Sequence, residues 1–197
     1  KQIIQLKDFV SPTSSTYIEV NVDQLINQKY LRFRRKITFP EDVFDLLEAD
    51  CQQLIRQADS GDSEKQFLLG KMLFEGSNKF PQNDEMGVDY IIEAINGGFV
   101  DSAIYYCQLI LDKKLQKQPD PDEMEFILSP LLNEENPLLL TLYGRIKKKE
   151  RNISVAKKYF KKASDAGDAE AMYEYGKILF KKSMELFEKS KINGCQK

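Results

Sequence analysis

Residues 167–176 read GDAEAMYEYG, and this stretch decides the fold because related stretches recur along the chain. Each begins with Gly or Glu and ends, nine residues later, in a small residue that follows an apolar one. The four stretches are Gly61 to Gly70, Gly98 to Cys107, Glu135 to Gly144 and Gly167 to Gly176. Their ends are 37, 37 and 32 residues apart. A period in this range is typical of stacked helical hairpins, none of which can bury its apolar face alone.

Apolar residues in the last repeat follow helical spacing. Between Ala169 and Phe180 they lie three or four residues apart on one stripe, and Asp168 is placed to act as the N-cap. The preceding segment carries a similar stripe from Val155 to Ala163, with lysines between its apolar residues. Gly167 separates the two segments and suits the left-handed conformation that ends many helices. The pattern therefore predicts two antiparallel helices joined by a tight turn.

The same reasoning predicts helices over most of the chain after Pro40. The expected ranges are 41–59, 62–75, 84–96, 101–112, about 122–130, 138–148, 155–163 and 169–180. Pro130 should bend or end its helix, whereas Pro137 lies in a first turn, where proline is tolerated. Residues 1–40 differ, with a loop at 11–16, a short alternating stretch at 18–22 and a possible helix at 23–35. We predict an all-α superhelix of about four helix pairs at 41–197, preceded by a partly irregular segment at 1–40.

These residues resemble the Sel1-like repeat family, a relative of the tetratricopeptide repeat. The first helix of that repeat opens with glycine, has alanine four residues later and reaches Leu/Tyr-Gly after five more, which Gly167, Ala171 and Tyr175-Gly176 match. The second helix carries a small residue, an aromatic and alanine, as at 156–163 and 87–94. Small residues let two helix axes approach closely. Lys65 departs from the pattern, so its crossing should be looser or partly exposed to solvent. Glu135 and Leu139 depart in the third unit.

The resemblance implies a non-enzymatic scaffold or adaptor that binds a protein or peptide on a concave face lined by the first helices. Family members serve ubiquitin-ligase complexes of ER-associated degradation or accompany catalytic domains such as kinases, and both roles stay open. From their positions on first helices, we expect partner contacts at Glu64, Lys71, Tyr105, Gln108, Glu174 and Lys177. The repeats leave the identity of the partner and the oligomeric state open.

Composition argues against catalysis. The chain has no histidine, which removes the commonest general base, the commonest metal ligand and every Ser-His or Cys-His pair. Its three cysteines, Cys51, Cys107 and Cys195, form no CxxC pair, so we interpret Cys51 and Cys107 as packing residues. We predict no catalytic residue, no metal and no cofactor.

Three charged or polar motifs have simpler explanations than chemistry. Gly61-Asp62-Ser63 resembles an esterase triplet but lacks its histidine, so Asp62 or Ser63 should cap a helix. The acidic residues at 120–125 lack the order of a calcium loop and suit the positive end of a helix dipole. The basic runs at 31–36 and 145–151 could bind nucleic acid or an anionic surface, but the second falls at a helix end that favours cations. We expect no nucleic-acid partner.

Charge and targeting signals constrain the compartment weakly. Residues 1–39 carry a net +4, residues 40–143 carry −14 and residues 144–197 carry +8. No stretch approaches the roughly 20 apolar residues of a membrane-spanning helix. The chain begins at Lys1, so we expect a fragment or a processed form. We predict a cytoplasmic protein, with the ER lumen as the alternative, in which case the Asn152-Ile153-Ser154 triplet could carry a glycan.

Overall fold

The computed structural model describes residues 39, 44, 47–77, 80, 82–132 and 136–192. Within these ranges the secondary structure is helical, apart from a single bridge between Ser77 and Phe80. The elements are α3 (Ala49–Asp59), α4 (Ser63–Glu75), α5 (Asp84–Asn96), α6 (Val100–Leu111), α7 (Pro121–Leu132), α8 (Pro137–Lys149), α9 (Ile153–Asp165) and α10 (Ala169–Ile192). The predicted all-α superhelix is confirmed. The features expected at 11–35, together with Glu135 and Cys195, lie outside the described residues.

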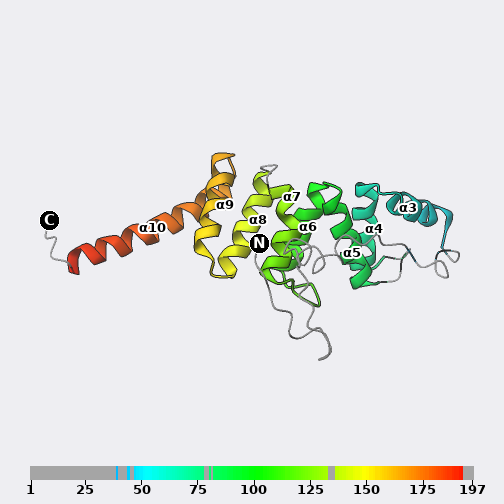
Figure 1. Cartoon of the computed structure of the whole chain (residues 1–197), viewed down its shortest axis with the longest axis horizontal. Helices are drawn as coiled ribbons and strands as arrows, with labels where there is room; N and C mark the ends of the chain where they lie inside the picture. The colour runs from blue at the N-terminus through cyan, green and yellow to red at the C-terminus, as the bar shows by residue number, and fades with distance from the viewer. Residues whose placement is uncertain are drawn as a thin grey trace, which may run out of the picture.

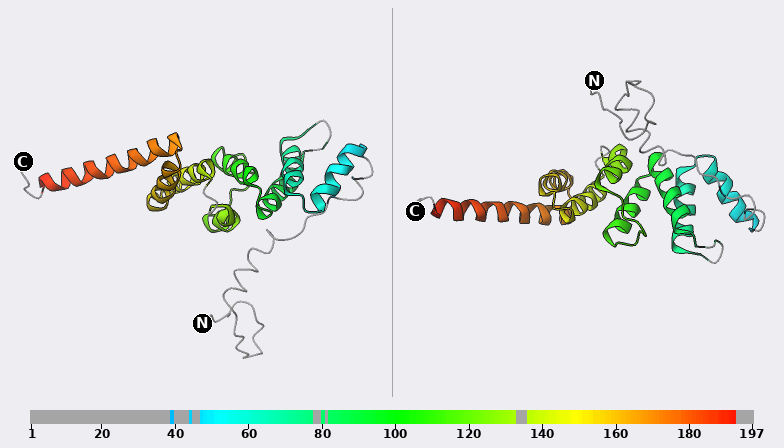
Figure 2. Two further views of the ribbon diagram at one scale, coloured as in Figure 1. Left: turned by 90° about the horizontal axis from the view of Figure 1, so that it is seen from above. Right: turned by 60° about the horizontal axis from the view of Figure 1, so that its bottom comes forward.

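The helices form an elongated row (Figure 1). They follow one another from α3 at one end to α9, and α10 then projects beyond the row (Figures 1 and 2). The repeats set two alternating classes, which we call first helices (α4, α6, α8 and α10) and second helices (α5, α7 and α9). The pairs α4–α5 and α8–α9 have the most extensive contacts of the described helices. In both pairs the first helix carries a glycine at the end of its repeat stretch, Gly70 in α4 and Gly144 in α8.

Two glycines bring paired helices together. A Cβ on Gly70 of α4 would lie 2.7 Å from the carbonyl oxygen of Gly87 and 2.9 Å from the backbone nitrogen of Ile91, both in α5. A Cβ on Gly144 of α8 would lie 2.8 Å from the ring of Phe160 in α9. These separations are too short for any side chain, so the helix axes can approach this closely only because the residue is glycine.

The glycine that opens each repeat has a different role. Gly61, Gly98 and Gly167 have φ values of +100°, +89° and +93°, and a Cβ on any of them would meet no atom within 4 Å. A lack of space is therefore not the reason for glycine at these positions. The reason is the left-handed backbone conformation that ends one helix and turns the chain into the next.

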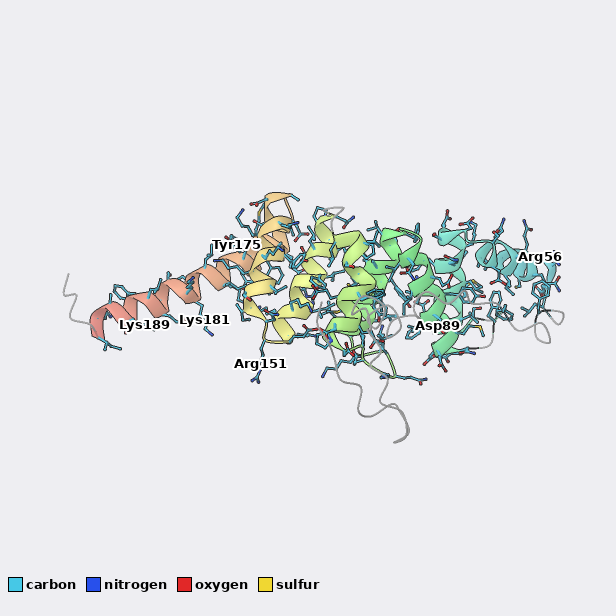
Figure 3. All side chains as sticks on the ribbon, viewed as in Figure 1. Arg56, Asp89, Arg151, Tyr175, Lys181 and Lys189 are labelled. Atoms are coloured by element: carbon cyan, nitrogen blue, oxygen red, sulfur yellow. The ribbon has the colours of Figure 1, made fainter. Side chains whose placement is uncertain are left out.

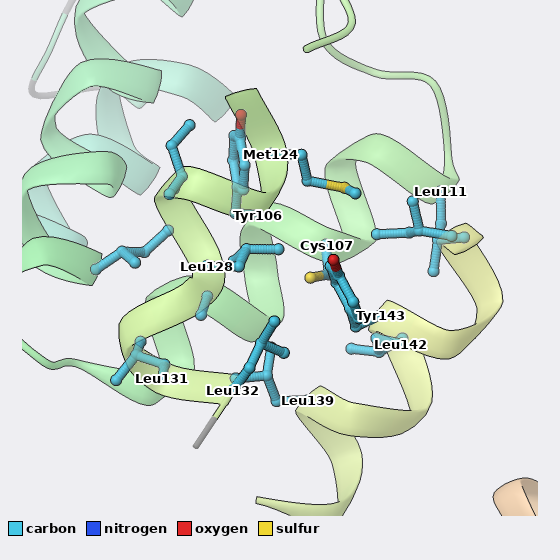
Figure 4. Packing of buried hydrophobic residues seen from close by; sticks show 14 of the residues in the cluster. Tyr106, Cys107, Leu111, Met124, Leu128, Leu131, Leu132, Leu139, Leu142 and Tyr143 are labelled. Atoms are coloured by element: carbon cyan, nitrogen blue, oxygen red, sulfur yellow. The ribbon is translucent and has the colours of Figure 1, made fainter. Parts of the chain in front are cut away.

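The second repeat shows how other small residues replace the glycine pattern. Cys107 is fully buried at the glycine position, and its burial raises the pKa of its thiol to about 12, so it packs as a small apolar residue. Ser102, also fully buried, donates a hydrogen bond from its hydroxyl to the Ile91 carbonyl at 2.6 Å. Figure 4 shows Cys107 beside Tyr143 of α8, with Leu128 of α7 closing the core nearby. The predicted packing role of Cys107 is confirmed.

Lys65 shows what happens where the repeat lacks its small residue. The Lys65 side chain is 28% exposed, whereas Ala171, at the same position of the last repeat, is fully buried. The partial exposure of Lys65 agrees with the sequence prediction, but a looser crossing is not seen, because α4 and α5 make extensive contacts and approach closely at Gly70. Leu139, the corresponding residue of α8, is also fully buried, so a larger apolar side chain can occupy the position.

Pro130 lies inside α7 close to its end at Leu132, as predicted, and Ser129 donates its hydroxyl to the Phe126 carbonyl, the one whose helical bond proline removes. Two predicted helix ranges are wrong. The range 41–59 is not one helix, because Glu48 is extended (φ −62°, ψ 154°) and α3 starts after it. The last helix runs to Ile192 instead of stopping near Phe180.

The pairing of α6 and α7 is more open than that of the other hairpins. Residues 112–120 form a long connection, and α7 lies across α5 as well as α6. The first helix α6 instead packs on α8 and α5. Repetition in the sequence therefore does not produce identical hairpins.

A partly buried hydrogen bond ties α3 to the first complete pair. The Tyr90 ring in α5 is 1% exposed, and its hydroxyl donates to Asp59 at the end of α3 at 2.7 Å. Burial, and then the bond to Asp59, raises the pKa of Tyr90 above its usual value. The folded chain therefore favours the protonated phenol.

The repeat glycines can be tested by matched substitutions. Gly70→Ala should lower the free energy of unfolding by about 1–3 kcal/mol relative to Gly176→Ala, because only the first collides with a neighbouring backbone. Both variants gain the same helix propensity, so their difference isolates the steric cost. Urea unfolding in dilute solution, where chains do not pair through α10, followed by circular dichroism, measures it. Equal stability of the two variants would contradict the close crossing.

Tyr90 predicts an alkaline limit to stability. Because its pKa is raised on folding, its contribution is complete below the unfolded pKa of about 10 and is lost as the pH rises above that value. Tyr90→Phe should cost about 1–3 kcal/mol at neutral pH and should reduce the fall in stability on going to alkaline pH. Urea unfolding at neutral and at alkaline pH measures the change in stability. The control is Tyr173→Phe, because Tyr173 is exposed. An identical alkaline fall in wild type and Tyr90→Phe would refute the assignment.

Candidate protein-binding surface

The structure places the six expected contact residues in separate groups. Lys71 of α4 and Tyr105 of α6 come together, with the Lys71 ammonium 5.5 Å from the centre of the Tyr105 ring. Glu64 lies at the start of α4, where it pairs with Lys65 at 3.2 Å, and Gln108 is exposed on α6. Glu174 and Lys177 lie on α10 and form an ion pair at 3.8 Å.

Aromatic residues that the sequence analysis missed complete the group around Tyr105. Phe67 of α4 packs edge-on against Tyr105, with 5.7 Å between ring centres, and against Phe99 at 5.5 Å. Phe67 precedes Lys71 by one helical turn, so the two side chains lie on the same side of α4. This spacing was the signal in the sequence that could have added Phe67 to the expected contact residues. We call Phe67, Lys71, Glu75, Phe99 and Tyr105 the α4–α6 surface cluster.

Glu75 orients the polar side of this cluster. It accepts a hydrogen bond from the Tyr105 hydroxyl at 2.9 Å and lies 4.0 Å from the Lys71 ammonium. Burial, followed by the bond to Glu75, raises the pKa of Tyr105, so the phenol stays a neutral donor. The cluster therefore presents the Lys71 ammonium, the Tyr105 phenol, which is oriented by Glu75, and the edges of aromatic rings. This combination suits recognition of a peptide, because aromatic residues supply rigid contact area.

The second group on α10 is held by helix α8. Glu174 pairs with Lys148 of α8 as well as with Lys177, and its side chain is only 15% exposed. Arg145 of α8 pairs with Glu170 at 3.3 Å in the same region. Glu174 therefore stabilises the contact between α8 and α10, whereas the Lys177 side chain is 53% exposed and available to a partner.

The basic run at 145–151 is largely used inside the fold. Lys147 is 3% exposed and pairs with Glu150 at 3.1 Å, and Lys149 donates to the Leu111 carbonyl at 2.7 Å. With Arg145 and Lys148 also paired, little of this run is presented as a free cationic surface. The run at 31–36 lies outside the described residues.

The polar motifs at helix starts act as caps. Asp62 accepts a hydrogen bond from the backbone N–H of Lys65 at 3.2 Å, which confirms its predicted capping role. Asp120 accepts from the Glu123 N–H at 2.7 Å while Glu123 accepts from the Asp120 N–H at 3.3 Å. This reciprocal pair is a capping box at the start of α7. No group of three potential metal ligands occurs among the described residues.

A hollow of about 510 Å³ lies between α5, α7 and the 112–120 connection. Its lining mixes apolar and polar residues, and its charged residues are mainly acidic, namely Asp84, Glu85, Asp89 and Glu123 beside Lys117. The hollow exists because α7 stands away from α6. The sequence carried a signal for it in the excess of acidic residues at 40–143, but not its location.

No helix in the described part of the chain is long and apolar enough to cross a membrane.

Comparison with solved structures relates this fold to a Sel1 repeat protein from Oxalobacter formigenes. The match has a TM-score of 0.52 and 21% sequence identity, and covers 66% of this chain and 99% of that one. Comparisons with protein-family models and with curated proteins gave no match. The match spans almost the whole of that bacterial chain and about two thirds of this one. The chain therefore has the helical fold of Sel1-like repeats.

Proposed function

We propose that this chain is a non-enzymatic scaffold that binds a protein or peptide along its first helices. The observation that carries the proposal is the α4–α6 surface cluster, in which an ammonium and aromatic rings from two successive repeats meet on one surface. Repeat arrays of this kind use extended faces built from equivalent positions of successive units.

The binding face includes the six residues expected from the sequence. Lys71 and Tyr105 form its centre, and Glu64 and Gln108 lie on the same two helices. Lys177 belongs to a separate group on α10, where Glu174 orients it and also holds the contact with α8. A partner with acidic and aromatic side chains fits the centre, because Lys71 offers a charge and Phe67 an apolar edge beside it. We propose the concave side of the superhelix for this face.

The narrower roles rest on the same surface. A regulatory repeat region beside a catalytic domain and an adaptor in ubiquitin-ligase or ER-associated degradation complexes would both use it for docking. We propose the cytoplasm as the compartment, with the ER lumen as the alternative. A glycan on Asn152 of the native protein would favour the lumen.

Quantitative affinity purification from cells of the encoding organism tests the proposal. The wild-type chain is compared with a variant carrying Lys71→Glu and Tyr105→Ala, and recovered partners are then measured by direct titration. We expect the variant to lose about tenfold in affinity, equivalent to about 1.4 kcal/mol, since it removes both central contacts.

The matched control carries Lys158→Glu and Lys161→Ala on the second helix α9, where both side chains are exposed. Circular dichroism confirms that both variants are folded. Partners that bind the two variants equally well would refute the proposed face. Turnover of a substrate by the purified chain would refute the non-enzymatic assignment.

A further inference from the structure

A seven-residue repeat runs along α10. Residues 172–192 read MYEYGKI, LFKKSME and LFEKSKI, so each unit has an apolar residue, an aromatic and, three positions later, a small residue. Aromatic and small residues thus alternate on one stripe, which consists of Tyr173, Gly176, Phe180, Ser183, Phe187 and Ser190. A spacing of three and four residues in a strict seven-residue period is typical of a helix that pairs with another helix along its length.

This stripe is exposed. Tyr173, Phe180 and Phe187 are 64%, 68% and 55% exposed, although they are large aromatic residues. The opposite side of the first half of α10 is the one that faces the core, through buried Ala171 and the partly buried Tyr175 and Ile178. Figure 3 shows Tyr175 near α9, whereas Lys181 and Lys189 lie on the projecting part. An apolar surface of this kind marks an interaction site.

The internal hairpins show what covers the equivalent position in other repeats. Gly144 of α8 is covered by the Phe160 ring from the antiparallel helix α9, and Gly70 of α4 is covered by antiparallel α5. Gly176 is the equivalent glycine of α10, and no described atom lies within 4 Å of the place where its Cβ would be. The surface of α10 therefore has the shape of a helix crossing whose second helix is not supplied by the described residues.

We propose that α10 pairs with α10 of a second copy in an antiparallel dimer. The alternation on the stripe selects this direction. When one of two identical stripes is reversed, every aromatic faces a small residue, and alternating large and small side chains fill each layer. In a parallel pair aromatic would face aromatic and small would face small, which crowds three layers and leaves voids in the others.

The full overlap of the two stripes defines one register. It places Tyr173 opposite Ser190, Phe180 opposite Ser183 and Phe187 opposite Gly176 of the second copy. The contact is its own image under a two-fold axis, as closed homodimers require. Phe187 of one copy would then cover Gly176 of the other as Phe160 covers Gly144 within the chain.

The size and charge of the stripe suit such a contact. Full burial of an aromatic side chain removes about 150–250 Å² from water, so the six exposed rings of two copies would contribute roughly 600–900 Å². Met172, Leu179 and Leu186, all at least 40% exposed, flank the stripe and bring the total near the roughly 1,200 Å² of a stable interface. The lysines beside the stripe are paired on their own helix, Lys177 with Glu174 at 3.8 Å and Lys191 with Glu188 at 3.5 Å.

Sedimentation equilibrium of the full chain over a range of concentrations tests the dimer. We expect a reversible dimer that Phe180→Ser and Ser183→Phe each weaken about tenfold, because each leaves a mismatched layer. The double variant Phe180→Ser/Ser183→Phe should recover most of the loss, since these two positions face each other and exchange volumes. Glu185→Phe is the control, because it adds an equal apolar group on the side away from the stripe.

Cysteine cross-linking tests the direction. In a Cys195→Ser background, a mixture of Tyr173→Cys and Ser190→Cys chains should form a disulfide between the two variants. Neither variant should cross-link to itself, because like positions would be about 25 Å apart at about 1.5 Å of rise per residue.

Several results would overturn the proposal. They are a chain that stays monomeric at every concentration, a dimer that neither stripe variant weakens, and cross-linking of Ser190→Cys to itself, which would indicate a parallel pair. A monomer whose stripe is covered only by a helix of another protein would also overturn it. The proposal does not depend on the scaffold function, since the α4–α6 surface cluster that carries that function lies on other helices and only Lys177 and Glu174 of the proposed face lie on α10.

Discussion

The close approach of first and second helices at a residue without a side chain is the constraint on which the rest of the structure depends. At Gly70 and Gly144 the neighbouring helix occupies the space of a Cβ. This contact sets the distance between helix axes, and the apolar residues on either side are buried because that distance is short. Where the residue is larger, as with Cys107 of α6, the side chain is still fully buried, but the pairing of α6 with α7 is more open.

Ion pairs connect helices of successive repeats. The basic third of the chain does not present a uniform cationic surface, because Arg145 and Lys148 of α8 pair with glutamates on α10. The acidic middle of the chain is partly concentrated around the hollow beside α5. A partner would therefore meet a mixed surface whose clearest feature is the aromatic and cationic α4–α6 surface cluster.

Particular residues show how far the sequence predicted the site and the fold. The spacing of Gly167, Ala171 and Gly176 predicted a hairpin, and the caps at Asp62 and Asp168 lie where they were expected. Lys71 and Tyr105 were predicted singly, but their contact with Phe67 joins two helices and has no local pattern. The prediction failed where tertiary contacts act on the backbone, as with Gln52, which bonds the carbonyls of Phe44 and Leu47 at the corner before α3.

The sequence by itself determined the helical class, the period and the places of tight crossings, because those depend on local spacing and on where a side chain is missing. It also contained the seven-residue repeat of α10, which could not be distinguished from the apolar spacing of the other helices before the structure showed that its stripe is exposed. Only the tertiary structure decided that α7 leaves α6, that Glu174 is held by Lys148, and that the surface at Gly176 is uncovered. Such outcomes depend on contacts between residues that are far apart in the sequence, and no local pattern encodes those contacts.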